Sequence, residues 1–405
     1  MHSTPHLNNM TDALIRFFNK PIFLNHRFIL IVFFLGTLVT AIQNTFFLDI
    51  NNYKIFYYSL QHLQQGKSLY IEHPSEYFDH YHYAPAFAVI FSPFFLLPFK
   101  VGLFLWHFFF GAVWIFAIYK MPLTNIQKVF ALWYVFQEYL LAISNAQTNP
   151  LIAVIPLFAY ICFENKKPFW AAFFILFGFH IKIYSIIAAA LFILYPQKLK
   201  FVLSSLFWGI ALGLLPLLVT SPSKMLWQYQ SWLNQLIIKT DHDKFANTSI
   251  HRIIHQTISP DVPTLMIIGV GAILFCTVYV YRRSFSATNF KMLFLASILI
   301  FQVIFQPAAE SATYITAVTG VVLYWFHCPR APIDFILMIA CYILTVTGST
   351  DLMPHYLKEH FMWPYVLKAW PCVLIWFRIL YLMHLQGLSE RNKTSTSASQ
   401  QVALR

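Results

Sequence analysis

The sequence predicts an all-α polytopic membrane protein, from its composition and from the spacing of its apolar runs. Hydrophobic residues make up 59% of the 405 residues, and charged residues make up only 10%. A soluble domain of this composition would lack the polar groups needed to cover its surface. Aromatic residues reach 19%, which fits lipid-facing helices with aromatic belts at the membrane interfaces.

The apolar runs set the expected number of helices. About 13 runs can be drawn, and several are shorter than the roughly 20 residues that span a bilayer. Short runs separated by polar residues are typical of broken or re-entrant helices, which occur where the irregular backbone lines a cavity. We therefore expect about 11–13 transmembrane or re-entrant helices in a membrane domain over 27–387, after a cytoplasmic segment at 1–26. Residues 388–405 are polar and rich in Ser and Thr, which predicts a disordered tail.

The net charge of +12 is spread along the chain in short basic groups between apolar runs, such as Lys166-Lys167. This pattern is typical of cytoplasmic loops and argues against a nucleic-acid partner, which would need a basic cluster. Between 84 and 128, either one apolar run is re-entrant or Lys120 and Lys128 lie outside. With the other basic groups inside, five polar segments fall on the outer face: 145–149, 180–182, 221–261, 306–310 and 350–363.

Two outer loops, 49–83 and 221–261, carry features of their own. The second contains a basic cluster of His251, Arg252 and His255. His251 and His255 have the spacing of some metal ligands, but no third ligand is near, so we favour an ordinary helix face and predict no metal site. In the first loop, five apolar residues at helical spacing predict an amphipathic helix in the membrane interface: Tyr53, Ile55, Phe56, Leu60 and Leu63.

Asp49 is the first acidic residue after the apolar run Phe28–Leu48. It stands where a span of about 20 residues would leave the membrane. One interpretation is an N-cap for the helix that follows, where an acidic residue is favourable. The other is a catalytic base at the membrane surface, and the two roles are compatible.

Lys182 and Glu310 are charged residues that interrupt apolar stretches. A charge at the position of Lys182 needs a partner or a watery cavity, unless the side chain snorkels to the nearest interface. Glu310 would be neutralised or paired at such a depth. We consider three roles for Glu310: binding an acceptor hydroxyl, acting as a second acid/base group, and pairing with Lys182.

Several short motifs follow one another in a recognisable order. They are the acidic Asp49, the turn Gly66–Tyr70, the helix start Tyr83–Phe87, the polar element Asn145–Asn149, the element around Lys182, and Asn247–Ile250. Over about residues 25–330, their order and spacing resemble glycosyltransferase family 87. Ala84 and Ala146 stand where that family usually has Pro and Gly, and Gln306–Glu310 matches its Ser-Pro-x-x-Trp segment only loosely.

The resemblance implies a GT-C-type fold and an integral-membrane glycosyltransferase of a bacterial inner (plasma) membrane. Such enzymes take a sugar from a polyprenyl-phosphate donor on the extracytoplasmic (periplasmic) side. Known relatives transfer mannose or arabinofuranose to lipid-linked or cell-envelope glycans. The expected partners are therefore a polyprenyl-phosphate sugar, a glycan acceptor and membrane lipids. No cofactor is identified, and a dependence on a divalent cation is left open.

The chemistry of such a transfer assigns roles to the candidate residues. A base must take the proton of the acceptor hydroxyl, and Asp49 fits this role; direct displacement with one carboxylate inverts the sugar. Cations or amides must stabilise the departing phosphate, a role expected for Lys182, Arg252 and His251. The remaining candidates would bind sugar or acceptor: Tyr83, Asn145, Gln147, Asn149, Asn247 and Glu310.

These binding roles have structural alternatives. The amides of 145–149 would satisfy a re-entrant backbone, Tyr83 would belong to an interfacial aromatic belt, and Asn247–Ser249 would cap a helix. Nucleotide-sugar chemistry finds no support, because the sequence has no phosphate-binding glycine loop. Asp241-His242-Asp243 has the Asp-x-Asp spacing but lies in a polar loop.

Two other functions are alternatives to glycosyl transfer. A lipid or glycolipid transporter (flippase) should show paired repeats and ionisable residues at the membrane midplane, whereas this chain shows no repeat and gathers its polar residues on one face. A non-catalytic subunit that binds a prenyl-linked glycan would tolerate the loss of Asp49.

Overall fold

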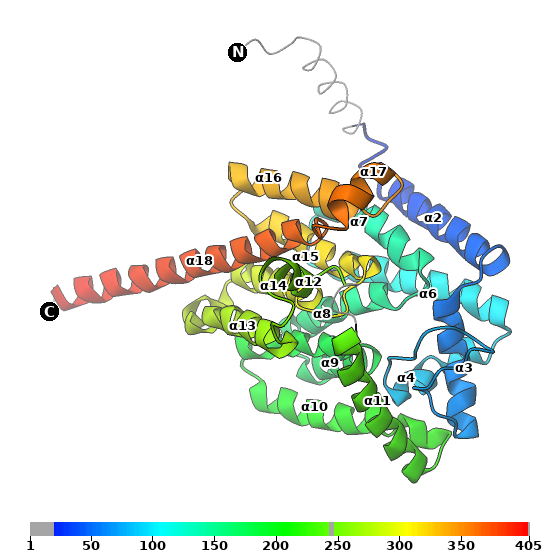
Figure 1. Ribbon diagram of the computed structural model, residues 1–405. Helices are drawn as coiled ribbons and strands as arrows, with labels where there is room; N and C mark the ends of the chain where they lie inside the picture. The colour runs from blue at the N-terminus through cyan, green and yellow to red at the C-terminus, as the bar shows by residue number, and fades with distance from the viewer. Residues whose placement is uncertain (1–19, 243–246, 404–405) are drawn as a thin grey trace, which may run out of the picture.

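The structure is a computed structural model that describes the backbone of residues 20–242 and 247–403 (Figure 1). These residues form helices joined by turns and loops, and no strand occurs among them. The all-α prediction is therefore confirmed. Four helical segments are long and apolar enough to cross a membrane: His26–Phe46, Phe99–Lys120, Lys198–Leu218 and Trp370–Glu390. Several others are apolar but shorter, as the sequence predicts.

The elements follow one another along the chain as a series of α-helices with short 3-10 or π segments, labelled η. The first half contains α2 (His26–Phe46), α3 (Asn51–Gln65), α4 (Pro85–Ile90), α5 (Ser92–Phe95), α6 (Phe99–Lys120), α7 (Asn125–Ser144), α8 (Asn149–Glu164), α9 (Pro168–Ile181), η1 (Ile183–Leu194), α10 (Lys198–Gly213) and η2 (Leu215–Leu218). The second half contains α11 (Pro222–His242), α12 (Ile250–Thr257), α13 (Thr264–Cys276), η3 (Thr277–Val280), η4 (Arg282–Ser286), α14 (Thr288–Ile304), η5 (Ser311–Thr313), α15 (Tyr314–His327), α16 (Pro332–Ala340), η6 (Cys341–Val346), α17 (His355–Leu357), η7 (Lys358–Met362) and α18 (Trp370–Ala403).

Short turns between packed helices, such as α8 and α9, give the bundle two ends. At one end Glu164 accepts hydrogen bonds from Lys291 Nζ at 2.7 Å and from Tyr195 Oη at 2.6 Å. We call this the basic end, because the groups around Lys166, Lys198, Arg282 and Arg330 lie at the helix ends there. We call the opposite end, with residues 145–149, 182 and 306–310, the polar end.

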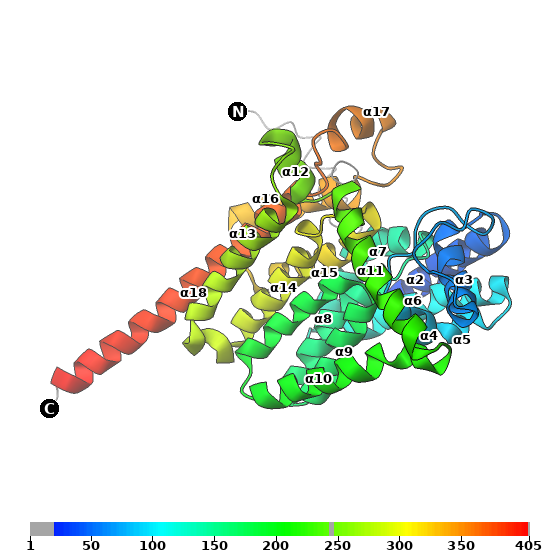
Figure 2. The same ribbon diagram turned by 60° about the horizontal axis from the view of Figure 1, so that its bottom comes forward.

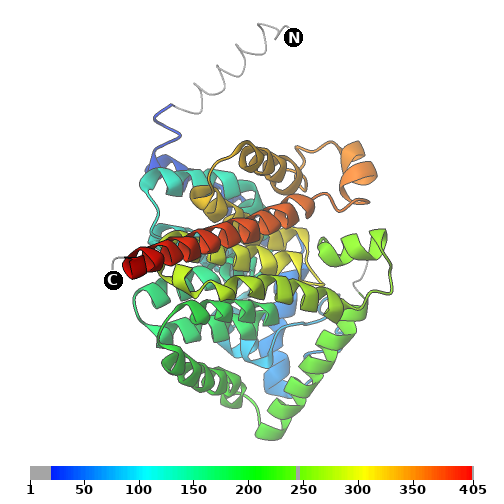
Figure 3. The same ribbon diagram turned by 90° about the vertical axis from the view of Figure 1, so that its left-hand side faces the viewer.

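The outer elements are arranged around this bundle. In Figure 2, α12 and α17 lie together beyond one end of the bundle, and α18 projects past the other. The path from α10 through α11 to α12 follows one edge of the molecule (Figure 3). The outer loop 221–261 therefore reaches from the edge of the bundle to its end.

The region 84–128 contains one long helix. α4 has 6 residues and α5 has 4, and each begins with a proline in its first turn, so neither can cross a bilayer. α6 then runs to Lys120, and the neighbouring Tyr119 hydroxyl lies 3.0 Å from Nδ1 of His26 at the start of α2. The run 84–98 is thus broken into two short helices, as the re-entrant alternative requires, and Lys120 lies at the basic end; how this run sits in a membrane stays a prediction.

The predicted helix of the first outer loop is α3, and all five of its predicted apolar residues are buried. They pack on protein, against α4, α5 and the ring of Trp106 in α6. Gly66 ends the helix at φ 67°, a conformation that glycine adopts at no steric cost. A Cβ at this position would also collide with the side chain of Lys224.

The turn between α7 and α8 is held by side chains from two other helices and from α3. The carbonyls of 144, 145 and 146 accept hydrogen bonds from Asn44 Nδ2 at 2.8 Å, Asn52 Nδ2 at 2.9 Å and Trp106 Nε1 at 2.9 Å. Ala146 has a φ of 49°, which costs a non-glycine residue about 1–3 kcal/mol. This positive φ explains why glycine suits the position, and the three donors hold the turn in place.

A buried ion pair supports the polar end from inside. Lys368 Nζ lies 2.7 Å from Glu138 Oε1, and the two side chains are 5% and 0% exposed. Lys368 also donates to Ser349 Oγ at 3.0 Å, and Ser349 donates to Ser311 Oγ at 3.2 Å. Because Ser311 follows Glu310 directly, these contacts connect the bundle interior to the 306–310 segment.

The C-terminal segment differs from the prediction. α18 continues to Ala403, so residues 388–403 are helical where the sequence predicts disorder. The stretch after Gly387 contains neither Pro nor Gly, and nothing in it forces the helix to end. Most of the expected cytoplasmic segment, residues 1–19, lies outside the described residues.

The positive φ of Ala146 predicts opposite effects for two substitutions. Ala146→Val should lower the melting temperature in detergent, because a β-branched residue is strongly disfavoured at positive φ. Ala146→Gly should leave stability unchanged or raise it by up to about 1 kcal/mol, because glycine adopts this conformation freely. A valine variant as stable as the glycine variant would contradict the geometry of the turn.

The buried ion pair predicts a large effect at Lys368. Lys368→Met leaves the Glu138 carboxylate buried without its cation, and we expect a loss of about 3–5 kcal/mol in unfolding free energy. Lys358→Met is the matched control, because the partner of Lys358, Asp351, is fully exposed and lies 3.4 Å away. Thermal melting in detergent should separate the two variants clearly, and equal melting temperatures would refute the structural role of the pair.

Candidate active site

A chain of hydrogen bonds joins Lys182 to Glu310 at the polar end. Lys182 Nζ donates to Asn149 Oδ1 at 2.7 Å, and Asn149 Nδ2 donates to Gln147 Oε1 at 2.6 Å. Gln147 Nε2 then donates to Glu310 Oε2 at 2.7 Å, across 163 residues of sequence. We call these four side chains the polar chain; all four are candidates predicted from the sequence.

Breaks between helices place the members of the polar chain. Lys182 has an extended backbone, with φ −139° and ψ 117°, between α9 and η1. Gln147 lies in the α7–α8 turn, Asn149 is the first residue of α8, and Glu310 follows the end of α14. Lys182 is half-buried, Asn149 and Gln147 are buried, and Glu310 is exposed. Lys182 thus has a polar partner, as a charge in an apolar stretch requires.

The segment 247–249 lies beside Glu310. The amide and hydroxyl of Thr248 both donate to the carbonyl of Ala309, at 2.8 and 3.0 Å. The Tyr314 hydroxyl donates to the carbonyl of Thr248. These contacts attach the second outer loop to the residue that precedes Glu310.

Asn247 and Ser249 form the start of α12. Ser249 is the N-cap, and its Oγ accepts from the amide of His251 at 3.3 Å. Asn247 Oδ1 accepts from the amide and the hydroxyl of Ser249, at 3.2 and 2.8 Å. The cap interpretation is therefore confirmed for this segment, and sugar binding by Asn247 stays a prediction.

Tyr83 reaches the polar chain from the first outer loop. Its ring packs on Phe56 and Phe87, with centroids 4.9 and 4.4 Å apart, and its hydroxyl lies near Thr148 and Glu310. Burial raises the pKa of Tyr83 above its usual value. The hydroxyl therefore stays protonated at neutral pH, where it can donate a hydrogen bond to a sugar.

Asp49 lies between α2 and α3 with its side chain 75% exposed. Its carboxylate pairs with Lys54 Nζ at 2.6 Å. The N-cap of α3 is Ile50, without a side-chain capping bond, so the predicted cap role of Asp49 is not observed. Asn52, three residues later, bonds the carbonyl of Asn145. Asp49 is therefore close in sequence to a residue that contacts the turn carrying Gln147.

The side chain of Asn145 turns away from the polar chain. Its Nδ2 donates to the carbonyl of Leu141 at 2.8 Å, in the last turn of α7. Its own carbonyl accepts the bond from Asn52. The side chain of Asn145 thus satisfies a backbone carbonyl, because the last carbonyls of a helix need donors. This is the structural alternative to sugar binding.

His251 and Arg252 lie on α12, and the hydrogen bonds described here join them to residues outside the polar chain. His251 Nε2 donates to the carbonyl of Phe305 at 3.0 Å, and burial lowers the pKa of His251 to about 4. The imidazole is therefore neutral at pH 7 and supplies no positive charge to a phosphate. The amide of Gln256, in the orientation that satisfies both of its partners, accepts from Arg252 Nε at 3.0 Å.

His255 supports the interpretation of α12 as an ordinary helix face. Its Nε2 donates to the carbonyl of Val262 at 2.9 Å, whereas His251 bonds Phe305. The two imidazoles therefore serve separate backbone carbonyls. The side chains of Asp241-His242-Asp243 lie outside the part of the molecule that the structure describes.

Two residues near the site are not among the candidates predicted from the sequence. The hydroxyl of Tyr184 lies near Tyr83 and Glu310. The sequence feature that could have indicated Tyr184 is its position two residues after Lys182. Lys368 supports the site through Ser349 and Ser311, as described above. The sequence feature that could have indicated Lys368 is a lone basic residue in an apolar run.

Metal-type donors gather away from the polar chain. Among the described residues, one group of His, Cys, Asp and Glu side chains has donor atoms close enough to share an ion. The group is His62, His73 and Glu76 in the first outer loop, whereas the polar chain contributes only the carboxylate of Glu310.

A cavity lined by lysines lies at the basic end, away from Lys182. An open cavity of about 540 Å³ is lined there by Lys166, Lys167 and Lys200, with Trp170 and Ser204. Its lysines could also attract an anion. It therefore competes with Lys182 as the place where a phosphate would bind.

Comparison with known proteins identifies the family. Residues 81–307, more than half of the chain, match the model of glycosyltransferase family 87. The matched segment contains most of the candidates, from Tyr83 to Arg252, whereas Asp49 and Glu310 lie outside it. No curated protein matches the chain. The apolar helices described above suit a membrane enzyme. The chain belongs to glycosyltransferase family 87.

Proposed function

We propose that the chain is an inverting glycosyltransferase of the extracytoplasmic membrane face. It moves a mannose-like or arabinofuranose-like sugar from a polyprenyl-phosphate donor to a lipid-linked or cell-envelope glycan. Family membership supports glycosyl transfer over lipid transport. The observation that carries the proposal is the polar chain, which has an ammonium at one end and a carboxylate at the other, among apolar helices.

Lys182 is the proposed ligand of the donor phosphate. Its ammonium is half-buried between two apolar elements, α9 and η1. A cation in such surroundings attracts an anion more strongly than it would in water. The charge that develops on the departing polyprenyl phosphate would therefore be stabilised there, while the prenyl chain follows the apolar helix surfaces.

Glu310, Gln147 and Tyr83 are the proposed sugar and acceptor ligands. A carboxylate and an amide within 2.7 Å of each other can share the hydroxyls of one sugar. The Tyr83 hydroxyl lies near Glu310. Glu310 is exposed, so an acceptor can reach it from outside the bundle.

Asp49 is the proposed base. The acceptor oxygen forms its new bond to the anomeric carbon while the bond from that carbon to the phosphate oxygen breaks. The electron pair leaves on the polyprenyl phosphate, and the acceptor proton passes to Asp49. A single displacement of this kind inverts the anomeric configuration. Glu310 is the alternative base, because its carboxylate lies in the polar chain itself.

The base assignment predicts the behaviour of Asp49→Asn. Membranes that carry this variant should transfer sugar from radiolabelled polyprenyl-phosphate mannose to lipid acceptors about 10²–10⁴-fold more slowly than wild type. Asp351→Asn is the matched control, because Asp351 is also an exposed carboxylate that faces a lysine, and it should keep the wild-type rate. Unchanged transfer by well-expressed Asp49→Asn, with loss in Glu310→Gln, would move the base to Glu310.

The phosphate assignment predicts the behaviour of Lys182→Gln. Loss of a hydrogen bond to a charged group costs about 1.5–3 kcal/mol, so kcat/KM for the donor should fall by roughly 10–100-fold. Lys200→Gln removes a lysine of the cavity at the basic end and should leave kcat/KM unchanged. The reverse result, with Lys200→Gln impaired and Lys182→Gln normal, would place the donor phosphate at the basic end.

A further inference from the structure

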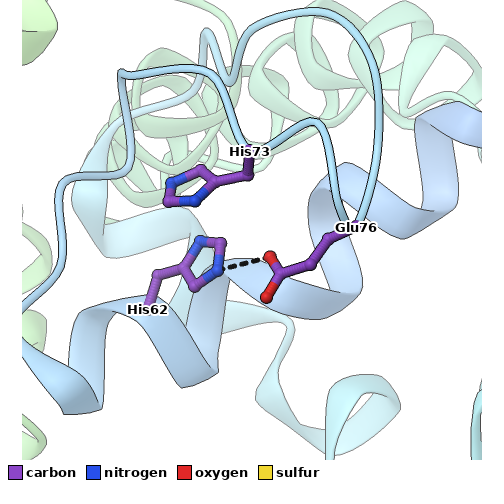
Figure 4. Close-up of side chains that lie close together, drawn as sticks. All are labelled: His62, His73 and Glu76. Carbon is purple, nitrogen blue, oxygen red and sulfur yellow. Dashed lines mark ion pairs between the residues drawn. The ribbon is translucent and has the colours of Figure 1, made fainter.

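Three side chains of the first outer loop converge on one point (Figure 4). His62 comes from α3, whereas His73 and Glu76 come from the loop that folds back over this helix. Their ligand atoms all lie within 4.8 Å of one another. His62 Nε2 is 2.6 Å from Glu76 Oε2, and the rings of His62 and His73 stack with centroids 3.9 Å apart.

The buried atoms of this cluster lack ordinary hydrogen bonds. His62 is fully buried, and neither of its ring nitrogens has a hydrogen-bond partner of acceptable geometry. The Glu76 oxygen that faces it is buried and lacks such a partner too. His62 Nε2 and Glu76 Oε2 face each other as an ion pair, whereas His62 Nδ1 is left without a hydrogen bond. A ligand shared by these atoms would satisfy them.

His73 is oriented as a metal ligand would be. Its Nε2 lies 2.9 Å from the carbonyl of Ser68, and a carbonyl only accepts, so Nε2 carries the proton. In a neutral imidazole the other nitrogen, Nδ1, then keeps its lone pair. A backbone carbonyl that fixes the tautomer in this way is the usual outer partner of a metal-bound histidine.

The surroundings of the cluster combine one carboxylate with aromatic rings. Glu76 supplies the negative charge, 2.6 Å from His62 Nε2. The rings of Tyr58 and Tyr77 flank His62, with centroids 6.3 and 6.2 Å away.

We propose that His62, His73 and Glu76 bind a zinc-like divalent transition-metal ion. Two imidazoles and one carboxylate are a known zinc ligand set, with the fourth position left to water. Hard cations such as Mg²⁺ and Ca²⁺ prefer oxygen ligands and fit this set poorly. Zinc binding would move the paired His62 and Glu76 atoms from 2.6 Å to about 3.4 Å apart, the ligand spacing of a tetrahedral ion.

The ion has a structural role at this position. It fastens the loop after Gly66 to α3, where Asn51 already holds the loop further along through the amide of Phe78, at 3.0 Å. The fastened loop carries Tyr70, whose hydroxyl donates to the carbonyl of Tyr83 at 2.8 Å. The ion thus stiffens the support of Tyr83, and this inference stands whether or not the proposed reaction is correct.

The test measures zinc binding by the full chain in detergent. After removal of metal with EDTA, titration with Zn²⁺ against a chromophoric chelator should load about one ion per chain, and metal analysis should confirm it. Mg²⁺ should not compete. His73→Gln and Glu76→Gln should each weaken zinc binding by at least about tenfold. Zinc should raise the melting temperature of the wild type but not of these variants.

His80→Gln is the matched control, because His80 lies in the same loop and pairs with Glu72 at 3.7 Å, outside the cluster. It should bind zinc as the wild type does. His73 and Glu76 are the residues to vary, because both are partly exposed, whereas replacing the buried His62 removes part of the core. Failure of the wild type to bind zinc, or equal weakening in His80→Gln, would overturn the proposal and leave a His62–Glu76 ion pair.

Discussion

Among apolar helices, every polar group of an irregular backbone needs a hydrogen-bond partner. The rest of the site depends on how the turn between α7 and α8 obtains these partners. The carbonyls of 144–146 accept bonds from Asn44, Asn52 and Trp106, so the turn is satisfied by its neighbours. Because the neighbouring helices satisfy the backbone of the turn, the side chains of Gln147 and Asn149 can bond Glu310 and Lys182 instead. The same constraint that makes the turn acceptable in an apolar bundle also assembles the polar chain.

The segment around Glu310 is held by contacts from two directions, whereas the side chain of Glu310 is exposed. From the interior, Glu138, Lys368 and Ser349 reach Ser311 through successive close contacts. From the outer loop, Thr248 bonds the carbonyl of Ala309. Glu310 stands between these anchors and remains exposed. A fixed backbone with an open side chain is what a binding group needs, because its orientation is set before the substrate arrives.

Much of this arrangement could be predicted from the sequence, because periodicity and polarity are local signals. The helix α3 and the convergence of 145–149, 182 and 306–310 followed from apolar spacing and from the sidedness of basic groups. The role of Asp49 as a cap did not hold, because its carboxylate bonds Lys54 instead. The pair of Glu138 and Lys368 lies 230 residues apart in sequence, and the cluster around His62 depends on how a loop folds back. Neither leaves a local pattern.

The position of a bound donor phosphate tests the central claim most directly. An experimental structure of the full chain with a polyprenyl phosphate would locate the phosphorus without reference to rates or expression levels. The phosphate should lie at the polar end, within hydrogen-bonding distance of Lys182 Nζ. A phosphate found at the basic end instead, in the cavity of Lys166, Lys167 and Lys200, would contradict the account.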